Sequence, residues 1–165
     1  MICGPMYSGK SEELIRRLTR AQIANRPFQL FKPAIDDRYS KTNVVSHSGI
    51  GMPCLVVQAA IDIYDRASTT PAIIAIDEVQ FFKQDIVEIL EELSGRGHRV
   101  IVAGLDLDSN GQPFGPMPEL LAVAEKVTKL TAVCQVCGEP ATRTYRTSTS
   151  KEQILVGAKD SYEAR

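Results

Sequence analysis

The sequence predicts an α/β fold in which helices cover both faces of a parallel sheet. Two segments, residues 72–76 and 100–103, are wholly apolar, as strands buried on both faces are. A helical repeat of apolar residues lies between them, and another follows a glycine-rich loop near the start of the chain. Strands that alternate with helices need right-handed crossovers, which make the strands parallel. The length of 165 residues suits one such domain with a small appendage.

The chain opens with a strand, a loop and a helix. Residues 1–3 have the composition of the end of a buried strand, and residues 4–11 form the glycine-rich loop. Apolar residues then recur at helical spacing, with charged residues on the other side of the helix; they are Leu14, Ile15, Leu18 and Ala21. The second strand candidate covers residues 28–32 and is closed by Pro33.

The middle of the chain continues this alternation as far as residue 125. A polar loop over 36–43 leads to short strand candidates at 44–45 and 53–57 and to a weak helix candidate at 59–66. An amphipathic helix follows the strand at 72–76, and two glycines end it; its markers are Ile86, Ile89, Leu90, Leu93, Gly95 and Gly97. From Lys126 the rhythm stops, so we predict an α/β domain over 1–125 and a small second domain over 126–165.

The composition argues against several kinds of partner. The net charge is −1 with both signs interspersed, which gives no support to a nucleic-acid or membrane-surface role. No apolar run approaches the roughly 18 residues of a membrane span, and no signal-peptide pattern is visible. We therefore expect a cytoplasmic protein with no nucleic-acid or membrane partner, whose four cysteines form no disulfide.

The glycine-rich loop has the spacing of a phosphate-binding P-loop. It consists of Gly4, Pro5, Met6, Tyr7, Ser8, Gly9, Lys10 and Ser11. The two glycines allow backbone conformations in which successive N–H groups point at one anion. Lys10 supplies a charge for the β- and γ-phosphates, and Ser11 offers a hydroxyl to Mg²⁺ at the start of a helix. The loop therefore predicts a nucleoside triphosphate site.

A pair of carboxylates, Asp77 and Glu78, follows the apolar strand at 72–76. Asp77 stands where a Walker-B acid does and is expected to hold Mg²⁺ together with Ser11. Neighbours on an extended segment point to opposite sides, so Glu78 can face a second substrate and accept a hydroxyl proton from it. The alternative is that Glu78 only caps the following turn. Because ligands collect at the carboxyl ends of parallel strands, the P-loop, this pair and Asp106 should converge.

Two further features have more than one interpretation. Arg38, in the polar loop, could stabilise charge on a transferring phosphoryl group, although a loop arginine is commonly solvated. Cys134 and Cys137 have zinc-knuckle spacing, but a structural Zn²⁺ needs four ligands and the chain ends at Arg165 without a second pair. The cysteine pair is therefore half of a zinc site, a degenerate site or a redox pair.

Five stretches in the same order resemble the type II (cellular-type) thymidine kinase family. The P-loop is similar in its Pro5-Met6 dipeptide, and residues 32–40 resemble a Lys-x-x-x-Asp-x-Arg-Tyr-Ser segment with Asp36 and Arg38. The remaining similar stretches are residues 76–82, residues 103–106 with 113–115, and residues 130–137. The resemblance covers essentially the whole chain. It implies a P-loop NTPase-like (RecA-like) domain and a small C-terminal zinc-ribbon and lasso domain. Since the second ligand pair is absent, we expect either that this second domain is truncated or that its zinc site is degenerate.

The resemblance also implies substrates and site residues. ATP with Mg²⁺ would be the donor, thymidine or deoxyuridine the acceptor, and dTTP the feedback inhibitor of a homotetramer. Glu78 would be the base, with Lys10 and Arg38 as further catalytic residues. Besides the P-loop, the ATP contacts would be Asp77, Glu78, Val79 and Gln80. The nucleoside contacts would be Met6, Asp36, Phe81, Leu105, Gln153, Ile154, Leu155, Val156, Gly157 and Tyr162. A structural Zn²⁺ would use Cys134 and Cys137 and a second pair missing from this chain.

Two other function classes remain open from the sequence. A P-loop ATPase or GTPase that drives a partner would use the same carboxylate pair, with Glu78 polarising a water molecule. A zinc-ribbon protein that binds nucleic acid would need a basic patch interleaved with aromatic residues, which the near-zero net charge does not favour. Thymine-selective binding favours the kinase, and tight, strongly salt-dependent binding of a polyanion favours the last class.

Overall fold

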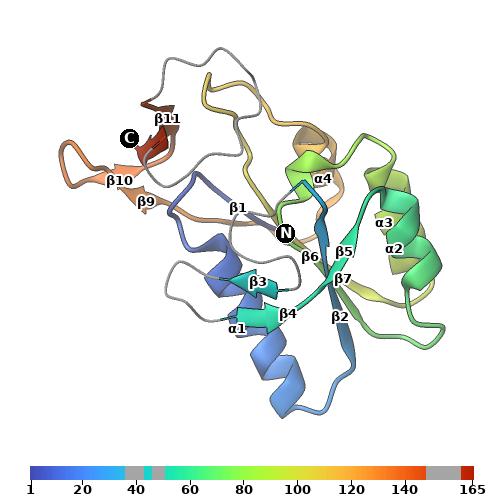
Figure 1. The fold of residues 1–165 in the computed structure, drawn as a ribbon. Coiled ribbons are helices and arrows are strands. Elements are labelled where there is room, and N and C mark those ends of the chain that lie inside the picture. Colours follow the sequence, from blue (N-terminus) through green and yellow to red (C-terminus); the bar gives the residue numbers. More distant parts are fainter. Residues whose placement is uncertain (36–42, 46–50, 148–160) are drawn as a thin grey trace.

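A six-stranded parallel sheet forms the centre of the molecule (Figure 1). The computed structural model describes residues 1–35, 43–45, 51–147 and 161–165. All neighbouring strands of the central sheet pair in parallel. Their order across the sheet is β5 (Leu55–Val57), β2 (Phe28–Pro33), β6 (Ile73–Ile76), β7 (Arg99–Gly104), β1 (Ile2–Cys3) and β8 (Thr128–Lys129). The parallel sheet predicted from the apolar strands is therefore confirmed.

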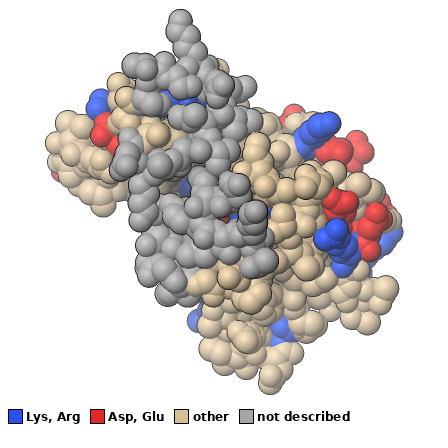
Figure 2. Space-filling view, in the orientation of Figure 1, with Lys and Arg blue, Asp and Glu red and all other residues tan. Residues whose placement is uncertain are grey.

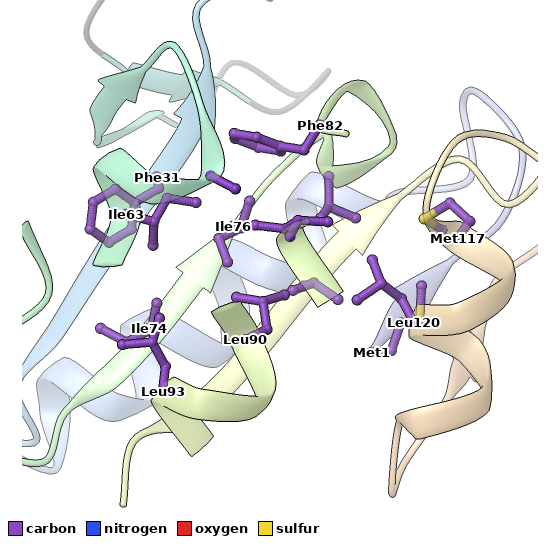
Figure 3. Packing of buried hydrophobic residues seen from close by; sticks show 14 of the residues in the cluster. Met1, Phe31, Ile63, Ile74, Ile76, Phe82, Leu90, Leu93, Met117 and Leu120 are labelled. Atoms are coloured by element: carbon purple, nitrogen blue, oxygen red, sulfur yellow. The ribbon is translucent and has the colours of Figure 1, made fainter. Parts of the chain in front are cut away.

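Helices cover both faces of this sheet, as predicted (Figure 1). They are α1 (Lys10–Ile23), α2 (Ala60–Arg66), α3 (Ile86–Gly95) and α4 (Met117–Val123). Alternate residues of β6 face opposite layers, since successive side chains of a strand point to opposite sides. Ile74 and Ile76 pack in the layer of Leu90 from α3 (Figure 3), whereas Ala75 lies in the layer of Leu18 from α1. Both layers are apolar, which explains why β6 has no polar residue.

Two elements differ from the expectation. The helix α4 was not predicted, because Pro116 and Pro118 interrupt the pattern that marks a helix; the proline at 118 lies in the first turn, where its missing N–H is tolerated. The strand expected over 53–57 is divided at Cys54. Its first part, β4 (Gly51–Pro53), forms an antiparallel hairpin with β3 (Asn43–Val45), and its second part is the edge strand β5.

The C-terminal part of the chain forms two small antiparallel sheets. One pairs β9 (Ala132–Val133) with β10 (Pro140–Ala141), and the other pairs β11 (Thr144–Arg146) with β12 (Tyr162–Ala164). Before them, β8 joins the central sheet beside β1. The domain division at residue 126 stays a prediction.

The described surface mixes charges of both signs. In Figure 2, acidic and basic side chains lie together at the side formed by α2 and α3. The ion pair between Arg96 and Glu92, 2.9 Å apart, belongs to α3 and the residue after it. Neither sign dominates that part of the surface. Within the residues that the structure describes, no helix is both long and apolar enough to cross a membrane.

An arginine pair on α1 gives a pH-dependent prediction. The Glu13 carboxylate accepts hydrogen bonds from Arg16 Nε at 2.6 Å and from Arg17 Nε at 2.8 Å. These bonds, with that of Arg16 the strongest, lower the pKa of Glu13 from 4.5 to about 2. A carboxyl group with a depressed pKa stabilises the fold above its unfolded pKa, and that contribution is lost as the pH falls to the folded pKa.

Replacing Glu13 with glutamine is expected to lower the free energy of unfolding at pH 7 by about 0.5–1 kcal/mol, because the pair is close to the surface. The difference from the wild type should shrink between pH 4.5 and about pH 2, the window set by the two pKa values. Urea unfolding at several pH values measures it. Glu12→Gln, at the exposed neighbouring position, is the control. A loss that is constant across this window would contradict the explanation.

Candidate active site

The glycine-rich loop at residues 4–11, which we call the P-loop after its sequence spacing, connects β1 to α1 through backbone conformations that favour glycine. Gly4 has φ 143° and Gly9 has φ 82°. A Cβ on Gly4 would lie 2.4 Å from the carbonyl oxygen of Leu130, so no other residue fits there without displacing the backbone. The hydroxyl of Ser8 donates to the carbonyl oxygen of Pro5 at 2.8 Å, which closes the turn. The sequence prediction of a strand, a glycine loop and a helix is confirmed at the level of structure.

Lys10 begins α1 and turns back along the loop. Its ammonium nitrogen donates to the carbonyl oxygen of Pro5 at 2.7 Å, and the residue is only 8% exposed. A buried ammonium held against the loop backbone brings its charge to the place where the loop N–H groups would bind phosphate.

Ser11 joins the loop to the carboxylate pair at the end of β6. Its hydroxyl donates to Asp77 Oδ2 at 2.8 Å. Burial, reinforced by the carboxylate of Glu78, raises the pKa of Asp77 to about 7. A hydroxyl and a buried carboxylate side by side are oxygen ligands of the kind Mg²⁺ prefers, so the donors present fit that ion. A bound cation would favour the charged form of Asp77 again.

The backbone conformation of Glu78 differs from the extended one that the sequence predicts. The sequence argument placed both residues on an extended segment, but Glu78 lies in the left-handed region with φ 53° and ψ 41°. The cause is the short 3₁₀ helix η1 (Val79–Phe81), which starts immediately after it. Its side chain makes no capping hydrogen bond to η1, so the capping alternative loses its support. The N–H of Glu78 donates to Asp77 Oδ1 at 3.0 Å.

Gly115 approaches η1 closely, and this contact gives a stability prediction. A Cβ on Gly115 would lie 2.5 Å from the carbonyl oxygen of Gln80, and Gly115 has φ 49°. Gly115→Ala is expected to lower the free energy of unfolding by about 2–4 kcal/mol, through backbone strain and the clash. Gly95→Ala is the control, because nothing lies within 4 Å of that Cβ, and it should be neutral or slightly stabilising. Urea unfolding measures both; equal effects would exclude the clash.

The C-terminal strands contact the P-loop directly. The N–H of Met6 donates to Thr144 Oγ1 at 3.0 Å, and the hydroxyl of Tyr7 donates to the carbonyl oxygen of Tyr162 at 3.0 Å. The guanidinium of Arg146 donates to the Tyr162 hydroxyl at 2.9 Å and lies 5.3 Å from the centre of its ring. Tyr162 was expected near a nucleoside. Thr144 and Arg146 fall within the lasso segment expected at about 142–157, but neither was named as a site residue, because neither belongs to a motif.

Apolar residues expected to line a base pocket lie in one cluster. Met6 and Phe81 pack, partly buried, against a core layer that includes Leu105 and Phe114. The rings of Phe81 and Phe114 meet edge to face, with centroids 5.6 Å apart and planes at 85°. The P-loop and the ends of β6 and β7 are thereby brought together. Seven further predicted residues lie outside the described residues: Asp36, Arg38, Gln153, Ile154, Leu155, Val156 and Gly157.

Two buried charges at the same edge of the sheet were not assigned a role from the sequence. Lys32 is 2% exposed and follows Phe31, whose carbonyl oxygen accepts the N–H of Asp77 at 3.0 Å. Asp106, which the sequence argument placed at this edge, is buried; its Oδ2 lies 2.8 Å from Lys129 Nζ. The signals for Lys32 in the sequence are its place at the start of the segment 32–40 and its position in a strand that is otherwise largely apolar.

The two cysteines of the knuckle do not complete a metal site with other described residues. Backbone N–H groups of Cys137 and Val136 lower the pKa of Cys134. Among the parts of the chain that the structure describes, no group of three or more histidine, cysteine or carboxylate residues could hold a metal ion. A structural zinc site needs four ligands, so Cys134 and Cys137 would supply two of them at most.

A cavity of about 600 Å³ lies at the amino end of β7, away from these residues. Met1, His98, Arg99 and Lys126 are among its lining residues, and none of the predicted site residues lines it. The P-loop and the carboxylate pair at 77–78 lie instead at the opposite, carboxyl edge of the sheet, where the parallel topology is expected to place a ligand.

The whole chain matches one family of known proteins. The family model described as thymidine kinase covers residues 1–165. The match thus includes the P-loop, the carboxylate pair at 77–78 and the C-terminal strands that contact the loop.

Proposed function

Because the chain belongs to the thymidine kinase family, we propose that it transfers the γ-phosphate of ATP to the 5′-hydroxyl of thymidine or deoxyuridine, giving dTMP from thymidine. The observation that carries this proposal is the hydrogen bond between Ser11 and Asp77. It joins the phosphate-binding loop to the strand end that bears Glu78, so donor and acceptor groups meet at one edge of the sheet. A transferase with this role serves pyrimidine salvage for DNA synthesis.

The donor side of the reaction uses the loop and Asp77. Backbone N–H groups of the loop from Tyr7 onward and the ammonium of Lys10 would bind the β- and γ-phosphates. Ser11 and Asp77 would hold Mg²⁺, which neutralises charge on the phosphates when bound. Arg38 is proposed to stabilise the negative charge on the phosphoryl group during its transfer.

The acceptor side uses Glu78. The 5′-oxygen of the nucleoside attacks the γ-phosphorus while the bond from that phosphorus to the β,γ-bridging oxygen breaks, and ADP leaves. The hydroxyl proton goes to the carboxylate of Glu78. The two carboxylates have different hydrogen-bond partners: Asp77 Oδ2 accepts from Ser11, whereas Glu78 Oε2 accepts from Gln80.

Thymine recognition is proposed for Met6, Phe81, Leu105 and Tyr162. Met6, Phe81 and Leu105 supply apolar surface, and Tyr162 is hydrogen bonded to the P-loop side chain of Tyr7. The residues at 153–157 are proposed to bind the edge of the base through backbone groups. An unpaired polar edge costs about 1–3 kcal/mol when buried, which is enough to disfavour cytosine. dTTP is the proposed feedback inhibitor.

Three further properties are proposed from the family resemblance. They are a homotetramer, a cytoplasmic location and a structural Zn²⁺ held by Cys134, Cys137 and a second pair of ligands. The zinc would stabilise the C-terminal strands and takes no part in phosphoryl transfer.

A ligand panel tests the proposed function. Thermal unfolding is measured with Mg²⁺ and each of dTTP, thymidine, ATP, GTP and dCTP, and phosphoryl transfer from ATP to thymidine is then assayed. We expect dTTP to raise the melting temperature well above the value with dCTP, because only the thymine edge is matched. If ATP and GTP bind but neither dTTP nor thymidine is preferred, the protein is a P-loop ATPase or GTPase instead.

A further inference from the structure

Gln80 is a buried polar residue whose side-chain amide is hydrogen bonded at both ends. The residue is 2% exposed and lies in η1, just after the carboxylate pair. Its Oε1 accepts the backbone N–H of Leu105 at 3.0 Å, and its Nε2 donates to Glu78 Oε2 at 2.5 Å. The amide thus forms a bridge between the end of β7 and the candidate base.

The orientation of this amide is fixed by chemistry. The backbone N–H of Leu105 can only donate, so the atom that faces it must be the amide oxygen. The NH₂ group then faces Glu78, whose ionised carboxylate can only accept. Turning the amide over would place two donors together at one end and two acceptors at the other. Both neighbours therefore select the same orientation.

The surroundings of Gln80 leave its side chain little room to move. A Cβ on Gly104 would lie 2.7 Å from Gln80 Oε1, 2.9 Å from Val79 Cγ1 and 3.1 Å from Met117 Sδ. The absence of a side chain at position 104 is what admits the amide. Gly115 makes the corresponding close approach to the backbone of Gln80, as described above. Close-packed interiors of this kind hold side chains in single rotamers.

Fixing one oxygen of Glu78 has a consequence for proton transfer. A base must lie within hydrogen-bond reach of the hydroxyl proton, and a misplacement of about 1 Å can cost roughly 100-fold in rate. A glutamate side chain has three rotatable bonds, so the backbone conformation of Glu78 alone does not set the position of its carboxylate. The hydrogen bond from Gln80 holds the carboxylate in one position.

We propose that Gln80 is a positioning residue, which holds the carboxylate of Glu78 in place against the end of β7 for proton transfer. This inference rests on the proposed kinase function and on the role of Glu78 in it. This role differs from the ATP contact that the resemblance implies for Gln80, because both ends of its side-chain amide form hydrogen bonds within the protein.

The test is a double-mutant cycle with steady-state kinetics. Gln80→Met keeps the length of the side chain and removes both hydrogen bonds. We expect kcat to fall roughly 10- to 100-fold while KM for ATP and for thymidine stays within about twofold, because binding groups are untouched. In the Glu78→Gln background the same substitution should cause no further loss, since two residues that act through one group are not additive.

Two controls make the result specific. Gln84→Met introduces the same change at an exposed position three residues after the end of η1 and should leave kcat unaltered. Gln80→Glu retains an acceptor for the Leu105 N–H but replaces the donor that faces Glu78, so it should lower kcat even if Gln80→Met does not fold. Melting temperatures establish that each variant is folded.

The outcomes separate this inference from the proposed function. A wild-type protein that does not phosphorylate thymidine refutes the function and with it the inference. An active wild type with a normal kcat in both Gln80 variants refutes the inference alone. An equal fold-loss in the presence and absence of Glu78 shows a general structural role, and that result also overturns the inference.

Discussion

Replacing Lys10 with alanine is expected to abolish measurable phosphoryl transfer and to weaken triphosphate binding. The ammonium of Lys10 lies 2.7 Å from the carbonyl oxygen of Pro5, inside the loop that would hold the phosphates. Removal of one preorganised charge from such a site costs roughly 100- to 1,000-fold in rate, and the loss of ground-state binding adds to this. Because Lys10 is buried, no solvent ion replaces it efficiently.

The measurement for Lys10 combines turnover with calorimetric titration of ATP in the presence of Mg²⁺. Lys83→Ala, at an exposed lysine just after η1, is the matched control and should retain both activities. Melting temperatures of the two variants show whether the fold survives. Turnover within tenfold of the wild type would disprove the P-loop assignment.

Replacing Glu78 with glutamine is expected to reduce turnover by roughly 100- to 10,000-fold, the usual contribution of a general base. The amide has nearly the same shape as the carboxylate, and its oxygen can still accept the hydrogen bond from Gln80 Nε2. It cannot take a proton from a 5′-hydroxyl at neutral pH. Nucleotide binding should persist or strengthen, because one negative charge beside Asp77 is removed.

Glu88→Gln serves as the control for this substitution, since Glu88 is an exposed glutamate on α3. Single-turnover kinetics separate the chemical step from product release, and titration of ATP measures binding. Near-normal turnover in the Glu78 variant would remove it from the role of base. Loss of ATP binding along with turnover would instead assign the glutamate to the donor site.

The features that could be predicted from the sequence are local in the chain. The P-loop, the carboxylates after β6 and the amphipathic α1 and α3 each depend on residues within a short window, so spacing alone identifies them. The conformation of Glu78 was predicted wrongly for a local reason as well. Strand alternation was extended one residue too far, and nothing in the composition of residues 77–79 marks the start of a 3₁₀ helix.

The features that could not be predicted depend on partners far apart in sequence. Leu105 is 25 residues from Gln80, and Thr144 is 138 residues from Met6. Such contacts follow from the order of strands in the sheet, which places the ends of β6 and β7 side by side. The burial of Lys32 could not be predicted either, and in the sequence this residue is only the first of the segment 32–40. A buried lysine is recognised by its surroundings, which the sequence does not give.

The tie between the P-loop and the C-terminal strands affects the order of events during synthesis. Met6 and Tyr7 are synthesised well before their hydrogen-bond partners Thr144 and Tyr162, which lie 138 and 155 residues further along the chain. Contacts of such high sequence separation form late, because the intervening chain must first be ordered. The loop at residues 4–11 of the nascent chain thus lacks these two hydrogen bonds until residues 144 and 162 have been made. Premature termination before residue 144 would leave Met6 and Tyr7 without these partners, however well the central sheet had folded.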